Sequence, residues 1–286
     1  MRDFSRILSY LTVIIAFAGP ALASNEIAET GDWLNPNTLS TLIFSILSLL
    51  IVLYAIWSVK SGRKFKIREI PGLKAVDEAV GRATEMGSPI LYTPGWGGDI
   101  QRPTTIASMN ILSSVATKTA EYDTRIIYPT HDPVIMAVAQ EVVKEACIKV
   151  GHPDRYRAED IFYISSSQFG YAAAVDGIIS REKPASVFLL GTFEAESLIL
   201  AETGNAIGSI QIAGTDSTIQ LAFFIVACDY TLIGEELFAA SGYLSGNESI
   251  LSSVKAQDII KILIALFIIV AMIWATIDPS STWWVF

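Results

Sequence analysis

Hydrophobic positions along the chain form three long apolar stretches and, between the second and third, a series of short apolar runs. The first stretch is uncharged from Ile7 to Asn25, and the second is uncharged between Asp32 and Lys60. The third covers Ile259 to Ile277 near the end of the chain. About 20 apolar residues suffice to cross the hydrocarbon core of a bilayer. The pattern therefore predicts transmembrane helices over residues 39–59 and 259–277.

The first apolar stretch allows two interpretations. A helix-breaking Gly19-Pro20 is followed by Ala21-Leu22-Ala23, the small-x-small pattern that precedes a signal-peptidase cleavage site. Residues 1–23 are therefore either a signal peptide, cleaved before Ser24, or a first transmembrane helix. The early proline and the alanine pattern favour cleavage.

Charged residues beside the apolar stretches indicate an orientation. Acidic residues alone precede the second stretch, and a basic cluster follows it: Lys60, Arg63, Lys64, Lys66 and Arg68. Positively charged flanks of transmembrane helices stay in the cytoplasm. We therefore expect a protein of the cell membrane (inner or plasma membrane) in which residues 60–258 are cytoplasmic. Residues 24–38 and the C-terminal tail 278–286 would then be extracytoplasmic.

Between the membrane stretches, short apolar runs alternate with amphipathic segments. The runs predict strands at 89–93, 125–128, 160–164, 185–190, 209–213 and 221–227. The amphipathic segments predict helices at 73–86, 104–121, 133–150, 169–182, 194–206 and 231–244. One helix start is especially clear, because Asp132 suits the N-cap and Pro133 the first helical position. The predicted fold class is α/β: a Rossmann-like, doubly wound, mostly parallel sheet of five or six strands, flanked by transmembrane helices.

Composition narrows the classes of function. The chain is 51% hydrophobic and carries a net charge of -9. Between Pro71 and Asp258 there are 23 acidic and 12 basic residues, so the predicted domain is acidic rather than charge-poor. A general nucleic-acid binder needs a basic face, and we therefore expect no nucleic-acid partner. Two cysteines are too few for a disulfide framework or a cysteine-rich zinc domain.

Ligands of open parallel sheets bind outside the carboxyl ends of the strands. The candidate ligand-binding residues at the predicted strand ends are Gly95, Gly97, Asp99, His131, Ser165, Glu194, Asp216 and Asp229. The glycine loop after the first strand lacks the third glycine of a dinucleotide fingerprint and the lysine of a phosphate-binding loop, so a flexible turn is favoured over phosphate binding. His131 suits a general base, although its neighbour Asp132 is better explained as a helix cap. No nucleophile elbow, zinc motif or Cys-x-x-Cys pair occurs, so catalytic residues and cofactors stay unassigned.

An acidic stretch offers one further hypothesis. No lysine, arginine or histidine occurs from Pro184 through Val254. If Glu194, Asp216 and Asp229 converge at one edge of the sheet, they suit a divalent cation or a cationic ligand. The alternative is that these carboxylates sit at helix N-termini, where the helix dipole favours negative charge. The second interpretation is favoured, and no metal site is predicted.

Four strings of the domain resemble a known family. They are Ala75-Val-Asp-Glu-Ala-Val-Gly-Arg-Ala-Thr-Glu-Met-Gly87, Ala195-Glu-Ser-Leu-Ile-Leu-Ala-Glu-Thr-Gly204, Ile210-Gln-Ile-Ala-Gly-Thr-Asp216 and Ala227-Cys-Asp-Tyr-Thr-Leu-Ile-Gly-Glu-Glu236. The chain is similar, over roughly residues 60 to 261, to an uncharacterised family of prokaryotic membrane proteins catalogued only as a domain of unknown function. The resemblance implies a membrane-anchored cytoplasmic α/β domain with a helix on each side. It implies no activity, cofactor or catalytic residue.

The leading functional hypothesis is a non-enzymatic scaffold or assembly subunit at the membrane. Its expected partners are the lipid bilayer and further copies of the chain or other membrane-protein subunits. The alternative is a membrane-anchored enzyme or sensor that binds a small molecule or metal in the crevice at the strand ends. The first hypothesis rests on double anchoring without a recognisable catalytic set.

Overall fold

The computed structural model describes residues 39–60, 71–246 and 248–277. The predicted signal peptide (1–23), the short segment 24–38, the basic residues 63–68 and the tail 278–286 lie outside the described residues. The chain divides into two units, Met1–Ser48 and Leu49–Phe286, and the second holds the α/β domain.

A six-stranded sheet forms the centre of the domain, and every neighbouring pair of strands is parallel. The strands are β1 (Ile90–Thr93), β2 (Ile126–Thr130), β3 (Ile161–Tyr163), β4 (Ser186–Leu190), β5 (Ile210–Thr215) and β6 (Tyr230–Ile233). Their spatial order is β3-β2-β1-β4-β5-β6. The chain therefore winds outward from β1 in one direction and from β4 in the other, as in a doubly wound sheet. The prediction of a parallel sheet of five or six strands is confirmed.

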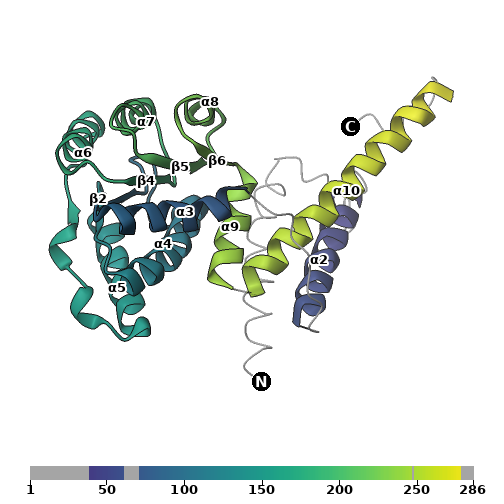
Figure 1. The fold of residues 1–286 in the computed structure, drawn as a ribbon. Helices are drawn as coiled ribbons and strands as arrows, with labels where there is room; N and C mark the ends of the chain where they lie inside the picture. Colours follow the sequence, from purple (N-terminus) through teal and green to yellow (C-terminus); the bar gives the residue numbers. More distant parts are fainter. Residues whose placement is uncertain (1–38, 61–70, 247, 278–286) are drawn as a thin grey trace, which may run out of the picture. The chain divides into compact units, whose positions relative to one another are not determined.

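Helices cover both faces of this sheet (Figure 1). They are α3 (Pro71–Met86), α4 (Pro103–Tyr122), α5 (Pro133–Val150), α6 (Gln168–Glu182), α7 (Glu196–Ala206), α8 (Thr218–Ala227) and α9 (Glu235–Ser245), with short 3-10 turns η3 (Pro153–Arg155) and η4 (Ala158–Asp160). Helices α6, α7 and α8 lie in a row over one face, while α3, α4 and α5 cover the other (Figure 1). Each face has its own apolar core. Tyr92 of β1 stacks between Tyr128 and Phe188 in one core, and Tyr171 and Phe224 are buried in the other.

The start of α5 illustrates how local chemistry sets a helix boundary. The Asp132 carboxylate accepts hydrogen bonds from the backbone amides of Val134 (2.6 Å) and Ile135 (3.4 Å). Pro133 follows as the first helical residue, and Gly151 ends the helix with a positive φ of 87°. The predicted cap and stop are both confirmed.

The last third of the domain corrects the predicted order of elements. Residues 221–227, predicted to be a strand, belong to helix α8, and the last strand is β6. The predicted helix 231–244 is therefore a strand followed by α9. A short apolar run cannot be assigned to a strand or a helix by periodicity alone. Here the helical period buries only Phe224 of α8, whereas a strand at the centre of the sheet would bury every side chain.

Helices α2 (Leu39–Lys60) and α10 (Glu248–Ile277) occupy the two apolar stretches outside the domain. The first turns of α10 pack against α9 and bury Ser252 and Ala256. Among the helices of residues 39–60, 71–246 and 248–277, none is long and apolar enough to cross a membrane.

Candidate functional site

The loops after β1 and β4 are bound to each other at the point where the strand order reverses. The Gly97 amide donates a hydrogen bond to the Thr192 carbonyl (3.0 Å), and the Thr192 amide donates to the Pro94 carbonyl (3.0 Å). Glycine is required for this approach, because a Cβ on Gly95 would lie 2.2 Å from the Thr192 oxygen, and one on Gly191 would lie 2.2 Å from the Pro94 oxygen. We call these contacts the loop clasp. The clasp bridges the crevice in which open parallel sheets usually bind their ligands.

Glu196, at the start of α7, connects three segments near the loop clasp through hydrogen bonds. Its side chain is 0% exposed. One carboxylate oxygen accepts from the amides of Trp96 (3.0 Å) and Glu194 (3.1 Å), and the other accepts from the Gln168 side chain (2.9 Å). A buried carboxylate needs such donors to replace its hydration. Glu196 therefore fixes the loop after β1 and the starts of α6 and α7 relative to one another.

His131, which follows β2, lies against the same loop. Its Nδ1 is 3.1 Å from the Gly95 carbonyl oxygen. Because a carbonyl oxygen only accepts, Nδ1 carries the proton and donates it to this bond. The centroid of the imidazole ring lies 6.0 Å from the ring centroids of both Trp96 and Tyr171. Burial lowers the pKa of His131, and the carbonyls of Gly95 and Gly98 and the charge of Asp132 oppose that shift.

Several hydroxyl groups also form hydrogen bonds near the loop clasp. The Tyr171 hydroxyl bonds to Thr93 at the end of β1, and burial raises its pKa well above the usual value for tyrosine. The hydroxyls of Thr104 and Thr192 lie 2.6 Å apart. Trp96, His131 and Gln168 are half-buried, so each is partly accessible to solvent beside the loop clasp. This arrangement suits stacking and hydrogen bonding to a small polar ligand.

Most of the candidate residues lie in or beside this site. Gly95 and Gly97 lie in the loop after β1, His131 bonds to Gly95, and Gly97 packs beside Glu194. The turn containing Ser165 is adjacent, since the Trp96 indole donates to the Ser166 carbonyl (2.9 Å). Asp99 is exposed and accepts from the amides of Gln101 and Arg102, so it stabilises its own loop.

The three carboxylates proposed as a cation site do not converge. Glu194 and Asp216 are exposed residues after β4 and β5, whereas Asp229 precedes β6 and so lies at the opposite edge of the sheet. There its carboxylate accepts a hydrogen bond from the backbone amide of Gln211 (2.8 Å). The prediction placed Asp229 at a strand end because residues 221–227 were taken for a strand. In the described part of the chain, no group of three His, Cys, Asp or Glu residues is arranged to hold a metal ion.

Gln168 and Glu196 both follow predicted strands, but the sequence does not predict that they contact each other and Trp96. The position of Glu196 in the first turn of α7 suggests only a favourable interaction with the helix dipole. Its burial depends on contacts with Trp96 and Gln168, which are distant in sequence. Such contacts leave no local pattern.

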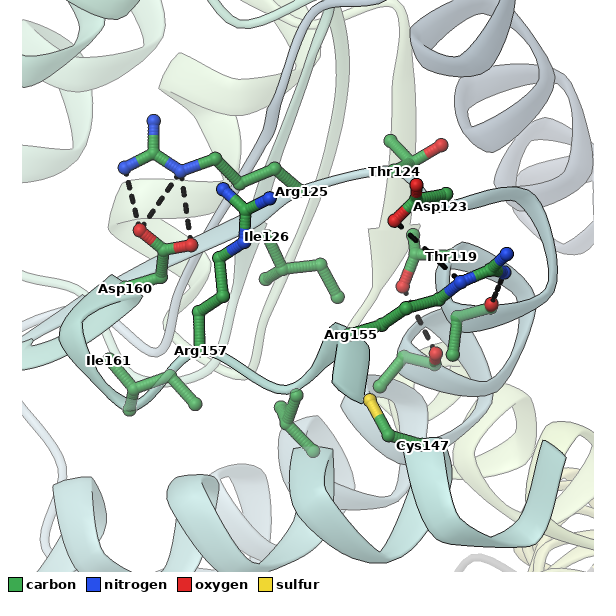
Figure 2. Close-up of a pocket in the computed structure, with 13 residues that line it drawn as sticks. Thr119, Asp123, Thr124, Arg125, Ile126, Cys147, Arg155, Arg157, Asp160 and Ile161 are labelled. Atoms are coloured by element: carbon green, nitrogen blue, oxygen red, sulfur yellow. Dashed lines mark hydrogen bonds and ion pairs between the residues drawn. The ribbon is translucent and has the colours of Figure 1, made fainter. Parts of the chain in front are cut away.

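A small pocket lies at the opposite edge of the sheet, near the starts of β2 and β3 (Figure 2). The nearly buried Asp160 accepts three hydrogen bonds from Arg125 (2.6–3.0 Å), and Arg155 pairs with Asp123 (3.7 Å). The cavity of about 40 Å³ has room for only a few water molecules. Small-molecule sites usually occupy roughly 300–1,000 Å³. We interpret the residues around the pocket as an ion-pair network that joins the turns before these strands.

A family model described as "Domain of unknown function (DUF6754)" matches residues 29–285. No curated protein and no solved structure matches the chain.

Replacing Gly191 with alanine tests the loop clasp. The added Cβ would overlap the Pro94 carbonyl oxygen, so we expect the free energy of unfolding to fall by about 3 kcal/mol or more. Gly81→Ala is the matched control, because a Cβ there meets nothing within 4 Å and lies in helix α3. That change should raise stability by up to about 1 kcal/mol. Chemical unfolding of the full-length chain measures both, and equal stability of the two variants would contradict the clasp.

His131 should make stability dependent on pH. Its pKa is lower in the folded chain than in the unfolded chain, so the unfolded chain binds more protons between the two values. The free energy of unfolding should therefore decrease as the pH falls from about 7.5 through the unfolded value of roughly 6.5. His131→Gln should flatten this dependence, whereas His152→Gln, at the other histidine, should retain it. Thermal unfolding midpoints between about pH 7.5 and 5.5 report the slope, and an unchanged slope in His131→Gln would refute the assignment.

Proposed function

The chain belongs to the family described as Domain of unknown function (DUF6754), and we propose that it is an integral membrane protein whose α/β domain is a non-enzymatic scaffold or assembly subunit. The description names no activity, so the proposal rests on geometry and sequence. The observation that carries it is an apolar surface on α8. The bridged crevice at the strand ends and the charge pattern of the chain add support.

Helix α8 presents apolar side chains to solvent. Val226 is 87% exposed and Ile219 is 71% exposed, and Phe223 and Ile225 are also exposed. Ile219, Phe223 and Val226 are spaced i, i+4 and i+7, which places them on one stripe of the helix. We call these four residues the α8 surface. Contiguous exposed apolar surface of this kind usually marks a contact with another macromolecule.

The strand-end crevice gives less support to catalysis. Its two central loops are joined by backbone hydrogen bonds, and Glu196, the buried carboxylate beneath them, already accepts three hydrogen bonds. Burial raises the pKa of the Cys228 thiol to about 12 and also raises that of Cys147, so both thiols stay protonated at neutral pH. A structural role explains each of these groups without a reaction.

Membrane anchoring is part of the proposal and is supported by the sequence. The chain is uncharged between Asp32 and Lys60, and Lys261 is the one charged residue from Ile259 to Ile277. The basic cluster after the first of these stretches favours a cytoplasmic domain and an extracytoplasmic C-terminus in the cell membrane. The lipid bilayer would then hold the domain beside other subunits, either further copies of the chain or other membrane proteins.

A second candidate function is the binding of a small polar molecule beside the loop clasp. The half-buried Trp96, His131 and Gln168 favour it, because the rings of Trp96 and His131 lie 6.0 Å apart and all three side chains are partly accessible to solvent. Under this second hypothesis the domain is a sensor or an enzyme, and its ligand contacts Trp96, His131 and Gln168 beside the loop clasp.

Native purification tests the assembly function. Full-length protein should be recovered in the membrane fraction and, in mild detergent, show a native mass larger than that of one chain. Val226→Asp places a charge on the α8 surface, so the assembled fraction should fall at least about tenfold, which corresponds to roughly 1.4 kcal/mol. Native mass spectrometry measures the fraction.

Val134→Asp is the matched control, because Val134 is an exposed valine on α5, a helix that covers the other face of the sheet. It should leave the assembled fraction unchanged. A single chain without associated protein, or equal losses in the two variants, would count against the proposal.

A thermal-shift screen tests the second candidate. If a nucleotide, sugar phosphate or divalent ion binds beside the clasp, it should raise the unfolding midpoint of the full-length chain, because a ligand that binds only the folded state stabilises it. Trp96→Leu should remove the rise by deleting the stacking surface, and Tyr122→Leu, at an exposed tyrosine, should retain it. No rise with any compound would exclude these ligands.

A further inference from the structure

Helix α8 lies at the end of the row that it forms with α6 and α7 (Figure 1). In the described part of the chain, α7 is the helix packed beside α8, and β6 is the last strand of the sheet. Ile233 of β6 is exposed as well and extends the apolar character to the sheet edge. The surface is therefore accessible to a partner from outside the domain.

Acidic residues stand at both ends of α8. The exposed Asp216 lies two residues before the helix, and the exposed Asp229 lies two residues after it. Helix α8 itself is uncharged, and its 10 residues separate the two carboxylates by roughly 15 Å along the helix axis. The sequence from Pro184 through Val254, which includes α7, β5, α8 and β6, contains no basic residue. The surface is thus an apolar stripe between two negative ends.

This charge arrangement disfavours two occupants. In a twofold dimer through α8, antiparallel helices would place Asp216 beside Asp229 of the second copy, and parallel helices would place each aspartate beside its own equivalent. Both arrangements place negative charges next to each other, and this repulsion weakens the dimer. An anionic membrane surface would likewise repel the two carboxylates.

We propose that the α8 surface docks a segment of a different protein subunit, in which apolar side chains are flanked at both ends by lysine or arginine. Apolar side chains of the partner cover Ile219, Phe223 and Val226, and its basic ends pair with Asp216 and Asp229. Burial of apolar area supplies affinity, and the paired ends fix the position of the segment. This inference rests on the proposed assembly function and specifies its partner.

Site-specific photo-crosslinking in native membranes tests the docking. A photoreactive amino acid replaces Val226 in the full-length chain, and the same replacement at Val134 on α5 is the control. Position 226 should yield a discrete product with another protein, at least about tenfold more abundant than any product from position 134. Peptide mass spectrometry should locate the bond in an apolar segment that has lysine or arginine at both ends.

Charge reversal provides the second readout. Asp216→Lys, combined with the photoreactive residue at 226, should lower the cross-linked yield about tenfold, because two positive groups then face each other. Asp154→Lys, at an exposed aspartate of η3, is the matched reversal and should leave the yield unchanged. Unaltered unfolding midpoints show that both variants fold.

Other outcomes overturn the inference. A cross-link to lipid, to a second copy or to the chain's own basic residues 63–68 would assign the surface to another occupant. Equal yields of cross-linked product at positions 226 and 134 would contradict the docking. A cross-linked partner segment without basic residues at its ends would also contradict it. These results differ from failure of the proposed function, because an assembled complex would still be found in detergent if its subunits met elsewhere.

Discussion

The close approach of two backbone segments at the centre of the sheet determines the arrangement of the strand ends. The loops after β1 and β4 meet through the amides of Gly97 and Thr192, at a distance that only glycine permits at positions 95 and 191. This contact prolongs the pairing of β1 with β4 beyond the last strand residues. It also sets the position of Trp96, and through it those of Glu196 and His131. The site is therefore a consequence of steric fit between two turns.

The surface at the strand ends differs from the surface of α8 in how well its side chains are satisfied. At the strand ends, buried polar groups are mostly satisfied by one another, and Glu196 accepts three hydrogen bonds within the chain. On α8, by contrast, side chains that would be stabilised by burial remain in water. Since burial of one large apolar side chain is worth about 1.5–3 kcal/mol, the larger unused free energy lies on α8. The assembly that we propose would use that free energy and would leave the loop clasp intact.

The local sequence pattern predicted the first five strands and the helices between them, and the boundaries of α5 have the clearest signals. Asp132 and Pro133 begin α5, and Gly151 ends it. The positions of Gly95, Gly97 and His131 after strands could be predicted from the sequence, and His131 bonds to Gly95 in the structure. The contacts of Glu196 with Gln168 and Trp96 could not be predicted, because they join separate loops and leave no local pattern. Asp229 was misplaced because one incorrect strand assignment moved it to the wrong edge of the sheet.

That misassignment has a physical cause that bears on function. An apolar run such as residues 221–227 is expected to be buried, and in a parallel sheet a fully apolar run is typical of a central strand. The structure instead forms a helix that buries Phe224 against Phe193 and leaves Ile219, Phe223, Ile225 and Val226 exposed. Places where local pattern and fold disagree are often functional. The apolar character of α8 exceeds what its own core requires, and this excess is the basis of the docking that we propose.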